Sequence, residues 1–414
     1  MTGPLNIDGI KQWLRNSSAW PAICGFRAAR FERNYRARRD AYYRQLELKG
    51  LVYDEAKAIE QARQRLDDRG YTPRPKPVGQ VRTFCVIGRH AWHHDLIESL
   101  EQFGPTTNCD YTPFGLDTAS RVEAAACRKK HAAHLLSKLE TEHAREPFDW
   151  LFVYGGGRNV HPETIRTIQQ RFGLPTVNLC LDDKNAWTIG PVGDVDGGQK
   201  DIAGAYDLSW TSASVACDWY LAEGGRAVYL PEGTTPANYT RTTEQYDMPI
   251  SFMGACYGAR PVVIGHLERA GLPIQVFGRG WGARGRSAES PVDLFSRSQI
   301  NFGIGGIAFS EALTNVKGRD FDVPCTGGGV YLTTYNPDLV RSFDVGREIL
   351  CYQNRDEAVE LARHYLARPE ACRRIADAAR ARCLAEHTWV HRYAAIGRML
   401  GFVQPEHAGA QDQP

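Results

Sequence analysis

The sequence predicts an α/β protein of two domains, each built around a parallel sheet, with a helical extension at the amino terminus. Short apolar runs alternate with longer helical segments from Val81 onward, and such alternation is typical of strand-helix-strand units. The alternation resumes after a polar linker at residues 241–249, which indicates a second domain. With 414 residues, 43% of them hydrophobic and 24% charged, the chain has material for two cores and an appendage.

The amino-terminal extension, residues 1–79, is rich in arginine. Lys and Arg outnumber Asp and Glu there, although the whole chain has a net charge of only +2. Apolar residues recur at helical spacing in two segments, and Asp54 and Gly70 suit the start and end of the second, so an αα-hairpin is expected. Its basic face suits a solvated packing or homo-oligomer contact, an anionic acceptor, membrane headgroups or nucleic acid. Residues 71–79 form a stiff, proline-rich linker.

The first domain, residues 80–240, has polar or glycine-rich segments after its apolar runs. In a parallel sheet such segments lie at the carboxyl ends of strands, where ligands bind. Asp182 and Asp183 follow the run PTVNLCL and are the candidate catalytic residues, because a carboxylate there can contact an acceptor or remove its proton. A helix cap is the alternative role for either. The segment GGGRN at 155–159 lacks the Lys-Ser or Lys-Thr of a phosphate loop and is expected to give backbone room.

Metal binding is not expected. His90, His93, His94 and Asp95 are ligand types that zinc prefers, but the expected turn at His90 separates it from the helix that follows. The 11 cysteines lack CxxC pairs and lie mostly in apolar runs, which is typical of reduced core thiols. No run has the length of a membrane-spanning helix and the first residues lack the apolar core of a signal peptide, so we expect a cytoplasmic protein.

The second domain, residues 249–386, opens with a strand that ends at Gly254, which is a candidate for contact with the nucleotide. Tyr257 and Arg260 then lead into a helix, whose amino terminus offers free N–H groups and partial positive charge to a phosphate, and Arg260 adds a full charge. The segment GRGWG after the next strand lacks the context of a dinucleotide fingerprint, so no nicotinamide cofactor is expected. Arg279 and Trp281 are instead candidates for contact with a nucleotide base, with an ordinary surface loop as the alternative.

Residues 313–335 combine two cations, an acid and a triple glycine. Lys317 and Arg319 suit a diphosphate, and Asp322 can accept both hydroxyls of a ribose. Residues without a Cβ let a backbone approach a ligand closely. The glycines concerned are Gly327, Gly328 and Gly329. The alternative is an ordinary loop-helix-strand connection with a surface ion pair and a tight turn.

Residues 317–366 also carry a resemblance to a known enzyme family. Their sequence is KGRDFDVPCTGGGVYLTTYNPDLVRSFDVGREILCYQNRDEAVELARHYL. It resembles the carboxyl-terminal half of the CgeB-like glycosyltransferases, which belong to the GT-B superfamily, and the similarity extends from about Ile250 to Arg392. The resemblance implies two facing Rossmann-like domains, a helix at residues 387–402 that crosses back to the first domain, and a tail at 403–414.

The family pattern also implies roles for single positions. In retaining GT-B enzymes an acid five residues before a glycine binds the nucleotide ribose, and Asp322 is its counterpart here. A second acid, eight residues earlier, usually faces the sugar. This sequence has Thr314 at that position, a departure that leaves the sugar contact and the stereochemical outcome open.

Together these features predict a glycosyltransferase. A nucleotide-diphosphate-sugar, with UDP-sugar preferred, would bind the second domain, and the acceptor hydroxyl, on a glycan, lipid-linked compound, small molecule or protein, would bind the first. Arg260, Lys317 and Arg319 with helix amino termini would neutralise the leaving group, so neither a metal nor a cofactor is expected, and no nucleic-acid partner is expected. The alternatives are a nucleotide-sugar epimerase of the same fold and a non-catalytic sugar- or nucleic-acid-binding protein, which the lost acid at Thr314 favours.

Overall fold

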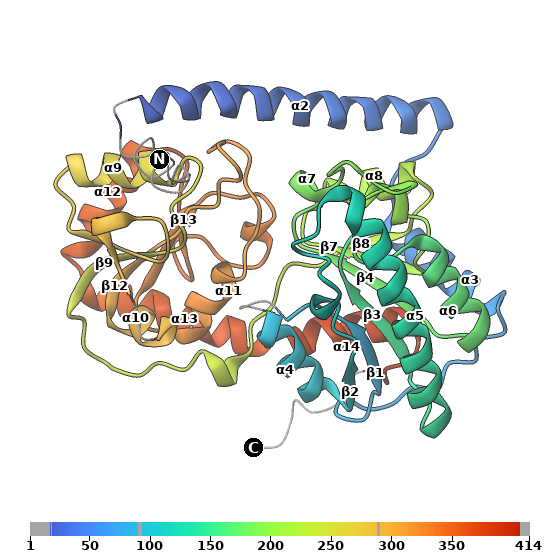
Figure 1. Ribbon diagram of the computed structural model, residues 1–414. Coiled ribbons are helices and arrows are strands. Elements are labelled where there is room, and N and C mark those ends of the chain that lie inside the picture. Colours follow the sequence, from blue (N-terminus) through green and yellow to red (C-terminus); the bar gives the residue numbers. More distant parts are fainter. Residues whose placement is uncertain (1–16, 18, 90–92, 288–289, 406–414) are drawn as a thin grey trace, which may run out of the picture. The chain divides into compact units, whose positions relative to one another are not determined.

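The computed structural model describes residues 17, 19–89, 93–287 and 290–405, and its chain divides into two compact units (Figure 1). Unit 1 comprises Pro231–Thr388 with the chain up to Arg39. Unit 2 comprises Asp40–Leu230 with the chain from Trp389 onward. Each unit contains one six-stranded sheet of parallel strands with helices on both faces, which confirms the predicted α/β class.

The sheet of unit 2 has the strand order β2-β1-β3-β4-β7-β8, and each neighbouring pair is parallel. Its strands are β1 (Thr83–Val86), β2 (Thr106–Asn108), β3 (Trp150–Tyr154), β4 (Thr176–Cys180), β7 (Leu208–Thr211) and β8 (Ala227–Tyr229). The helices of this unit are α3 (Glu55–Asp67), α4 (His93–Phe103), α5 (Arg121–Arg145), α6 (Pro162–Phe172), α7 (Asp183–Ala186), α8 (Ala216–Ala222) and α14 (Trp389–Leu400). A short antiparallel pair, β5 (Pro191–Val192) and β6 (Val195–Asp196), stands apart from the sheet.

Alternate residues of each strand enter different cores of unit 2. Phe84 and Val86 pack with α5 and α6, whereas Cys85 packs with α4 and α14. Both faces of β1 are therefore buried, as the continuous apolar run TFCVI predicts for a parallel strand. The helix predicted near residues 387–402 is α14, and its Trp389 and Tyr393 contribute to the core of unit 2.

The sheet of unit 1 has the order β11-β10-β9-β12-β13-β14, and its neighbouring strands are also parallel. The strands are β9 (Met248–Met253), β10 (Ile274–Phe277), β11 (Gly285–Arg286), β12 (Ser298–Phe302), β13 (Val330–Thr334) and β14 (Leu350–Tyr352). The helices are α9 (Arg260–Arg269), α10 (Pro291–Arg297), α11 (Arg319–Thr326), α12 (Arg355–Leu366) and α13 (Pro369–Glu386).

Two cores flank this sheet as well. Ile250 and Phe252 of β9 pack with α9 and α12, while Tyr331 of β13 packs with Phe321 of α11 and with α13. The central strand β9 lies between β10 and β12, so the loops that leave these three strands emerge side by side at one edge of the sheet.

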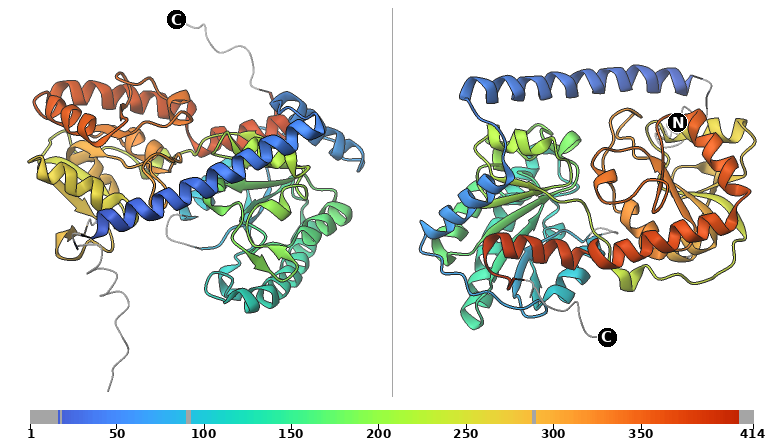
Figure 2. Two further views of the ribbon diagram at one scale, coloured as in Figure 1. Left: turned by 90° about the horizontal axis from the view of Figure 1, so that it is seen from above. Right: turned by 180° about the vertical axis from the view of Figure 1, so that it is seen from behind.

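The long helix α2 (Trp20–Lys49) is continuous in every view and belongs to both units (Figure 2). Its first part packs on unit 1, where Trp20 and Cys24 form a cluster with Val262. Its second part packs on unit 2, where the Tyr42 ring stacks on Trp219. The helical extension predicted at the amino terminus contains α2, and each part of this helix buries apolar side chains in one of the two units.

The helix α3 starts where the sequence predicts. The Asp54 side chain accepts a hydrogen bond of 2.8 Å from the Lys57 N–H, which satisfies one of the free donors of the first turn. Ala58, Ala62 and Leu66 form its buried face, and the helix contacts β7, β8 and α14. Residues 55–67 are thus part of the body of unit 2.

The described cysteines and helices also bear on the predicted class. All 11 cysteines are free thiols, and nine of them are buried, as their positions in apolar runs predict. Among the helices in the described part of the chain, none has the length and apolar character needed to cross a bilayer.

Candidate functional site

Two arginines converge at the carboxyl end of β9. A Cβ placed on Gly254, the residue after the strand, would lie 2.7 Å from Arg319 Nη1 and 3.0 Å from Arg260 Nη1. Both guanidinium groups also lie over the Phe252 ring, at 5.7 Å for Arg260 and 5.3 Å for Arg319. The structure therefore brings together three residues that the sequence predicts for phosphate binding, Gly254, Arg260 and Arg319, and adds Phe252 beneath them.

Each of these arginines is the first residue of a helix. Arg260 opens α9 and Arg319 opens α11, and neither helix has a side chain that caps its first turn. Uncapped amino termini carry free N–H groups and partial positive charge. The two helix ends and the two guanidinium groups thus add up to a strongly positive point over Gly254.

The charge of Arg260 has no ion-pair partner among the described residues, whereas the charge of Arg319 interacts with that of Asp320. Arg260 is 7% exposed, donates to the Ala255 carbonyl at 3.0 Å and leaves its Nε without a partner among the described residues. Burial, and next the charge of Arg319, lower the pKa of Arg260 to about 10. Arg260 therefore stays charged at neutral pH, and a bound anion would relieve both the repulsion and the desolvation.

Tyr257 and the residues around Arg319 complete this edge. The Arg260 guanidinium lies 4.1 Å from the centre of the half-exposed Tyr257 ring, and Arg319 donates to the Met253 carbonyl. Lys317 stands two residues before α11, and its backbone N–H donates to Asp320 at 2.9 Å. The predicted cations thus come from two adjacent segments of one unit.

Asp322 lies on α11 one turn after Arg319. Its Oδ1 accepts a hydrogen bond of 3.0 Å from the Thr234 hydroxyl. A Cβ on Gly318 would lie 3.4 Å from Asp322 Oδ2 and 3.2 Å from Glu232 Oε2, so two carboxylates approach the start of α11. The sequence did not predict the contact between Thr234 and Asp322, which joins segments 88 residues apart.

A buried acid that the sequence analysis missed supports the same helix. Asp320 is 3% exposed, accepts from the Tyr331 hydroxyl at 2.6 Å, and has a raised pKa because of burial. The alternation of β13 could have pointed to this contact, because it turns Tyr331 toward the helix that precedes the strand. Asp320 and Tyr331 together fix the angle at which α11 starts.

Trp281 holds its loop in place, and its contact with a nucleotide base stays a prediction. Trp281 is 2% exposed, and its indole N–H donates to the Gly254 carbonyl at 2.7 Å. The ring packs on Phe252 with a centroid distance of 5.9 Å and serves to hold the loop after β10 against the end of β9. Arg279 is exposed in that loop, where its carbonyl accepts from Cys256 N–H at 2.9 Å.

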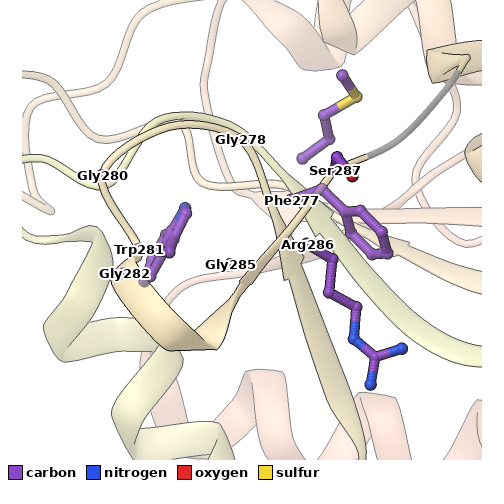
Figure 3. Close-up of a pocket in the computed structure, with 9 residues that line it drawn as sticks. Phe277, Gly278, Gly280, Trp281, Gly282, Gly285, Arg286 and Ser287 are labelled. Atoms are coloured by element: carbon purple, nitrogen blue, oxygen red, sulfur yellow. The ribbon is translucent and has the colours of Figure 1, made fainter.

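The loop after β10 nevertheless encloses a cavity of about 460 Å³ (Figure 3). The cavity is lined by Met253, Phe277, Gly278, Gly280, Trp281, Gly282, Gly285, Arg286 and Ser287. Met253 is shared with the arginine site, because its carbonyl accepts from Arg319. The cavity and the positive point are therefore neighbours, and Arg286 and Ser287, which the sequence did not single out, are the polar side chains on its wall.

The triple glycine approaches the protein's own backbone. A Cβ on Gly328 would lie 2.3 Å from the Phe295 carbonyl oxygen, and one on Gly329 would lie 1.8 Å from that of Ser298. Gly327 ends α11 with φ of 65°, a value that favours glycine. The space beside Gly328 and Gly329 is filled by the end of α10 and the start of β12, so the missing Cβ atoms allow this packing, and contact with a ligand stays a prediction.

Asp182 and Asp183 differ sharply in their surroundings. Asp182 is exposed at the carboxyl end of β4, where the sequence places an acceptor contact. Asp183 is 0% exposed and accepts from the Thr211 and Tyr220 hydroxyls. Burial raises its pKa to about 7, and those hydrogen bonds oppose the rise. Asp183 is thus buried and hydrogen-bonded within unit 2, whereas Asp182 is the exposed member of the pair, and contact of either with an acceptor stays a prediction.

Two further sequence features are the histidine cluster and the position of the lost acid. His90 lies outside the described residues, as do the side chains of His93 and His94, and elsewhere in the described chain no three His, Cys, Asp or Glu side chains group as metal ligands. Thr314, in the position of the sugar-facing acid, is 9% exposed and pairs with Gly306 in a short β-bridge.

Comparison with known proteins adds to this geometry. Residues 260–398, which include Arg260 and Arg319 and begin after Gly254, match the family model described as glycosyl transferase-like. The chain is similar in structure to a sucrose-phosphate synthase from Thermosynechococcus elongatus, with a TM-score of 0.53 and 10% identity over 78% of this chain and 99% of that one. It is also similar to HepE from Anabaena, solved in complex with UDP and glucose, with a TM-score of 0.50 and 9% identity over 77% and 99% of the two chains. The chain has the GT-B fold. A comparison with curated proteins finds no significant match.

Proposed function

We propose that this protein is a glycosyltransferase, of the CgeB-like kind, that moves a sugar from a nucleotide-diphosphate-sugar to an acceptor hydroxyl. The observation that carries the proposal is the convergence of Arg260 and Arg319 over Gly254, within a glycosyl transferase-like domain. Two buried or half-buried cations at two helix amino termini match the charge of a diphosphate. The proposal keeps the cytoplasmic location predicted from the sequence.

The same arrangement suggests how the chain would accelerate transfer. Negative charge grows on the departing diphosphate as the bond to the sugar breaks, and Arg260, Arg319 and the starts of α9 and α11 would stabilise that charge. This amount of fixed positive charge allows a mechanism without a metal ion. In this proposal Asp322 holds the ribose, and the cavity beside Met253 receives the base.

Asp182 is the group we propose as the contact to the acceptor. It is the exposed member of the acid pair at the end of β4. If the enzyme inverts configuration, Asp182→Asn should slow transfer by about 10²–10⁴-fold with donor binding unchanged. Normal transfer by a folded Asp182→Asn variant would remove this residue from the reaction.

The nucleotide class can be tested by thermal shift with UDP, GDP, dTDP and CMP. A nucleotide that binds the native state raises the melting temperature through linkage, and we expect UDP to give the largest rise, in keeping with the UDP complex of the HepE structure. Asp322→Ala should weaken that nucleotide by about 1.5–3 kcal/mol. No rise with any nucleotide would contradict the proposal. Conversion of the donor sugar without release of nucleotide would indicate an epimerase instead.

A further inference from the structure

The first turns of α2 contact the loop that carries Arg260. The Trp20 indole N–H and the Cys24 thiol both donate to the Gly258 carbonyl, each at 3.3 Å. The two residues are four apart, so they lie on one face of the helix, and both are buried. Burial raises the pKa of the Cys24 thiol to about 11, so it keeps its proton at neutral pH.

The next turns of α2 contact a second loop of unit 1, between β12 and α11. Glu32 accepts a hydrogen bond of 2.6 Å from the Ser310 hydroxyl, and this hydroxyl in turn accepts from Leu313 N–H at 2.9 Å. The Arg27 guanidinium lies 5.0 Å from the centre of the Phe309 ring. One face of one helix therefore holds two loops of the same unit.

These two loops press against each other through their backbones. A Cβ on Gly258, where φ is 58°, would lie 1.7 Å from the Ala308 carbonyl oxygen. Ala308 itself has a φ of 51°, a conformation that costs an alanine free energy. Such a contact needs support from the surrounding structure, and α2 supplies hydrogen bonds to both sides of it.

Arg260 is two residues from the carbonyl that α2 holds. The backbone N–H of Arg260 donates to the Tyr257 carbonyl at 3.2 Å, so Tyr257, Gly258 and Arg260 belong to one turn. Repulsion between the guanidinium groups of Arg260 and Arg319 favours movement of this turn away from Gly254. Hydrogen bonds that fix the turn would keep Arg260 in place before an anion binds, which lowers the cost of binding.

We propose that Trp20 and Cys24 are positioning residues for the diphosphate site, acting through Gly258 on Arg260. Glu32 supports them by holding the Ser310 loop that abuts the turn. The inference rests on the proposed function and deepens it, because it makes the amino-terminal helix part of nucleotide binding.

The test is the dissociation constant of UDP, measured by calorimetry. The double variant of Trp20→Phe and Cys24→Ala keeps the aromatic ring and removes both donors. We expect it to bind UDP about threefold to tenfold more weakly than the wild type, the loss expected for one to two neutral hydrogen bonds. In an Arg260→Met background the same two changes should have no further effect, because they act through Arg260.

Matched controls come from the other end of the same helix and from Glu32. Gln45 and Lys49 donate to the Ala222 carbonyl in unit 2, at 2.9 and 3.0 Å. Their replacement by alanine should leave the UDP dissociation constant unchanged. Glu32→Ala should weaken UDP, and Glu32→Gln, whose amide oxygen still accepts from Ser310, should restore it.

The outcomes separate the two proposals. If the wild type does not bind UDP or another nucleoside diphosphate saturably, the proposed function fails and the inference fails with it. If the wild type binds and the Trp20 and Cys24 double variant, once shown to be folded by circular dichroism, binds within twofold of it, the inference alone is overturned. Equal losses in the Gln45 and Lys49 variants would also overturn it, because they would show a general effect of α2.

Discussion

At the scale of single residues, Arg260 combines burial with an unbalanced charge. No carboxylate in the described part of the chain forms an ion pair with it, and a second guanidinium lies beside it. A buried cation without a partner lowers the stability of the folded state. Residues that bind charged ligands commonly have this cost, because their charges are balanced only when the ligand is bound.

Arg260→Met tests that trade-off. Methionine has a similar length and no charge, so we expect the ligand-free variant to be as stable as the wild type or up to about 2 kcal/mol more stable. It should lose most of the stabilisation by UDP. The measurement is urea unfolding with and without UDP, and Arg269→Met, an exposed arginine on the same helix, is the control. A marked loss of ligand-free stability would show that Arg260 is structural.

The pair Asp182 and Asp183 gives a prediction about pH. The pKa of Asp183 in the folded protein is about 7, above the value of about 3.9 in an unfolded chain. Between these values the folded state binds the proton more tightly, so this group's contribution to stability is full at low pH and is lost as pH rises through 7. Asp183→Asn, which has no proton to lose, should show a smaller fall in unfolding free energy between pH 5 and 8.

The exposed neighbour acts on the same group. The charge of Asp182 contributes to the raised pKa of Asp183, so Asp182→Asn should also reduce the fall in unfolding free energy, by less than Asp183→Asn does. If the unfolding free energies of the wild type and Asp183→Asn changed equally with pH, the pKa of Asp183 would not be raised in the folded protein.

At the scale of elements, the docking of α3 depends on a buried acid before β7. Asp207 is 0% exposed. Its carboxylate accepts hydrogen bonds from two guanidinium nitrogens of Arg69, at 2.7 and 2.8 Å, and from the Thr176 N–H, at 2.9 Å. Arg69 lies two residues beyond the end of α3. The ion pair thus ties the end of this helix to the starts of β4 and β7.

Arg69→Met should therefore destabilise unit 2. Removal of one partner leaves a buried carboxylate with fewer donors, and we expect a loss of about 3 kcal/mol in unfolding free energy. Lys57→Met, at an exposed position on the same helix, should change it by less than about 0.5 kcal/mol. Denaturant unfolding of both variants is the measurement, and similar values for the two would contradict the role of Asp207.

The secondary-structure elements of this protein could be predicted from the sequence more fully than its side-chain contacts. The runs TFCVI and PTVNLCL are strands β1 and β4, because a parallel strand is buried on both faces and is apolar throughout. Arg260 and Arg319 were predictable too, since a strand, a turn and a helix in sequence place the first helical residue at the sheet edge. The contacts of Trp281 and of the triple glycine within the protein were not, because what a ring or a missing Cβ contacts depends on segments distant in sequence.

At the scale of the whole molecule, the two units are not consecutive stretches of sequence. In the sequence, the residues of unit 1 lie before and after the stretch Asp40–Leu230 of unit 2, and α2 contributes residues to each unit. The sequence predicts that α2 is a helix with an apolar face, and Tyr42 and Leu46 on that face are buried, but the sequence does not show which unit each end of the helix packs against. The contacts of Trp20 and Tyr42 that assign its two ends come from side chains of other segments.

The central claim is that the positive point over Gly254 binds a diphosphate, and the affinities of UDP and UMP test it most directly. The account predicts that the wild type binds UDP at least tenfold more tightly than UMP, because the second phosphate makes charge-assisted hydrogen bonds. Arg260→Met and Arg319→Met should each reduce the difference to within about threefold. Equal affinities of the wild type for UDP and UMP, or a tenfold difference that survives in both variants, would contradict the account.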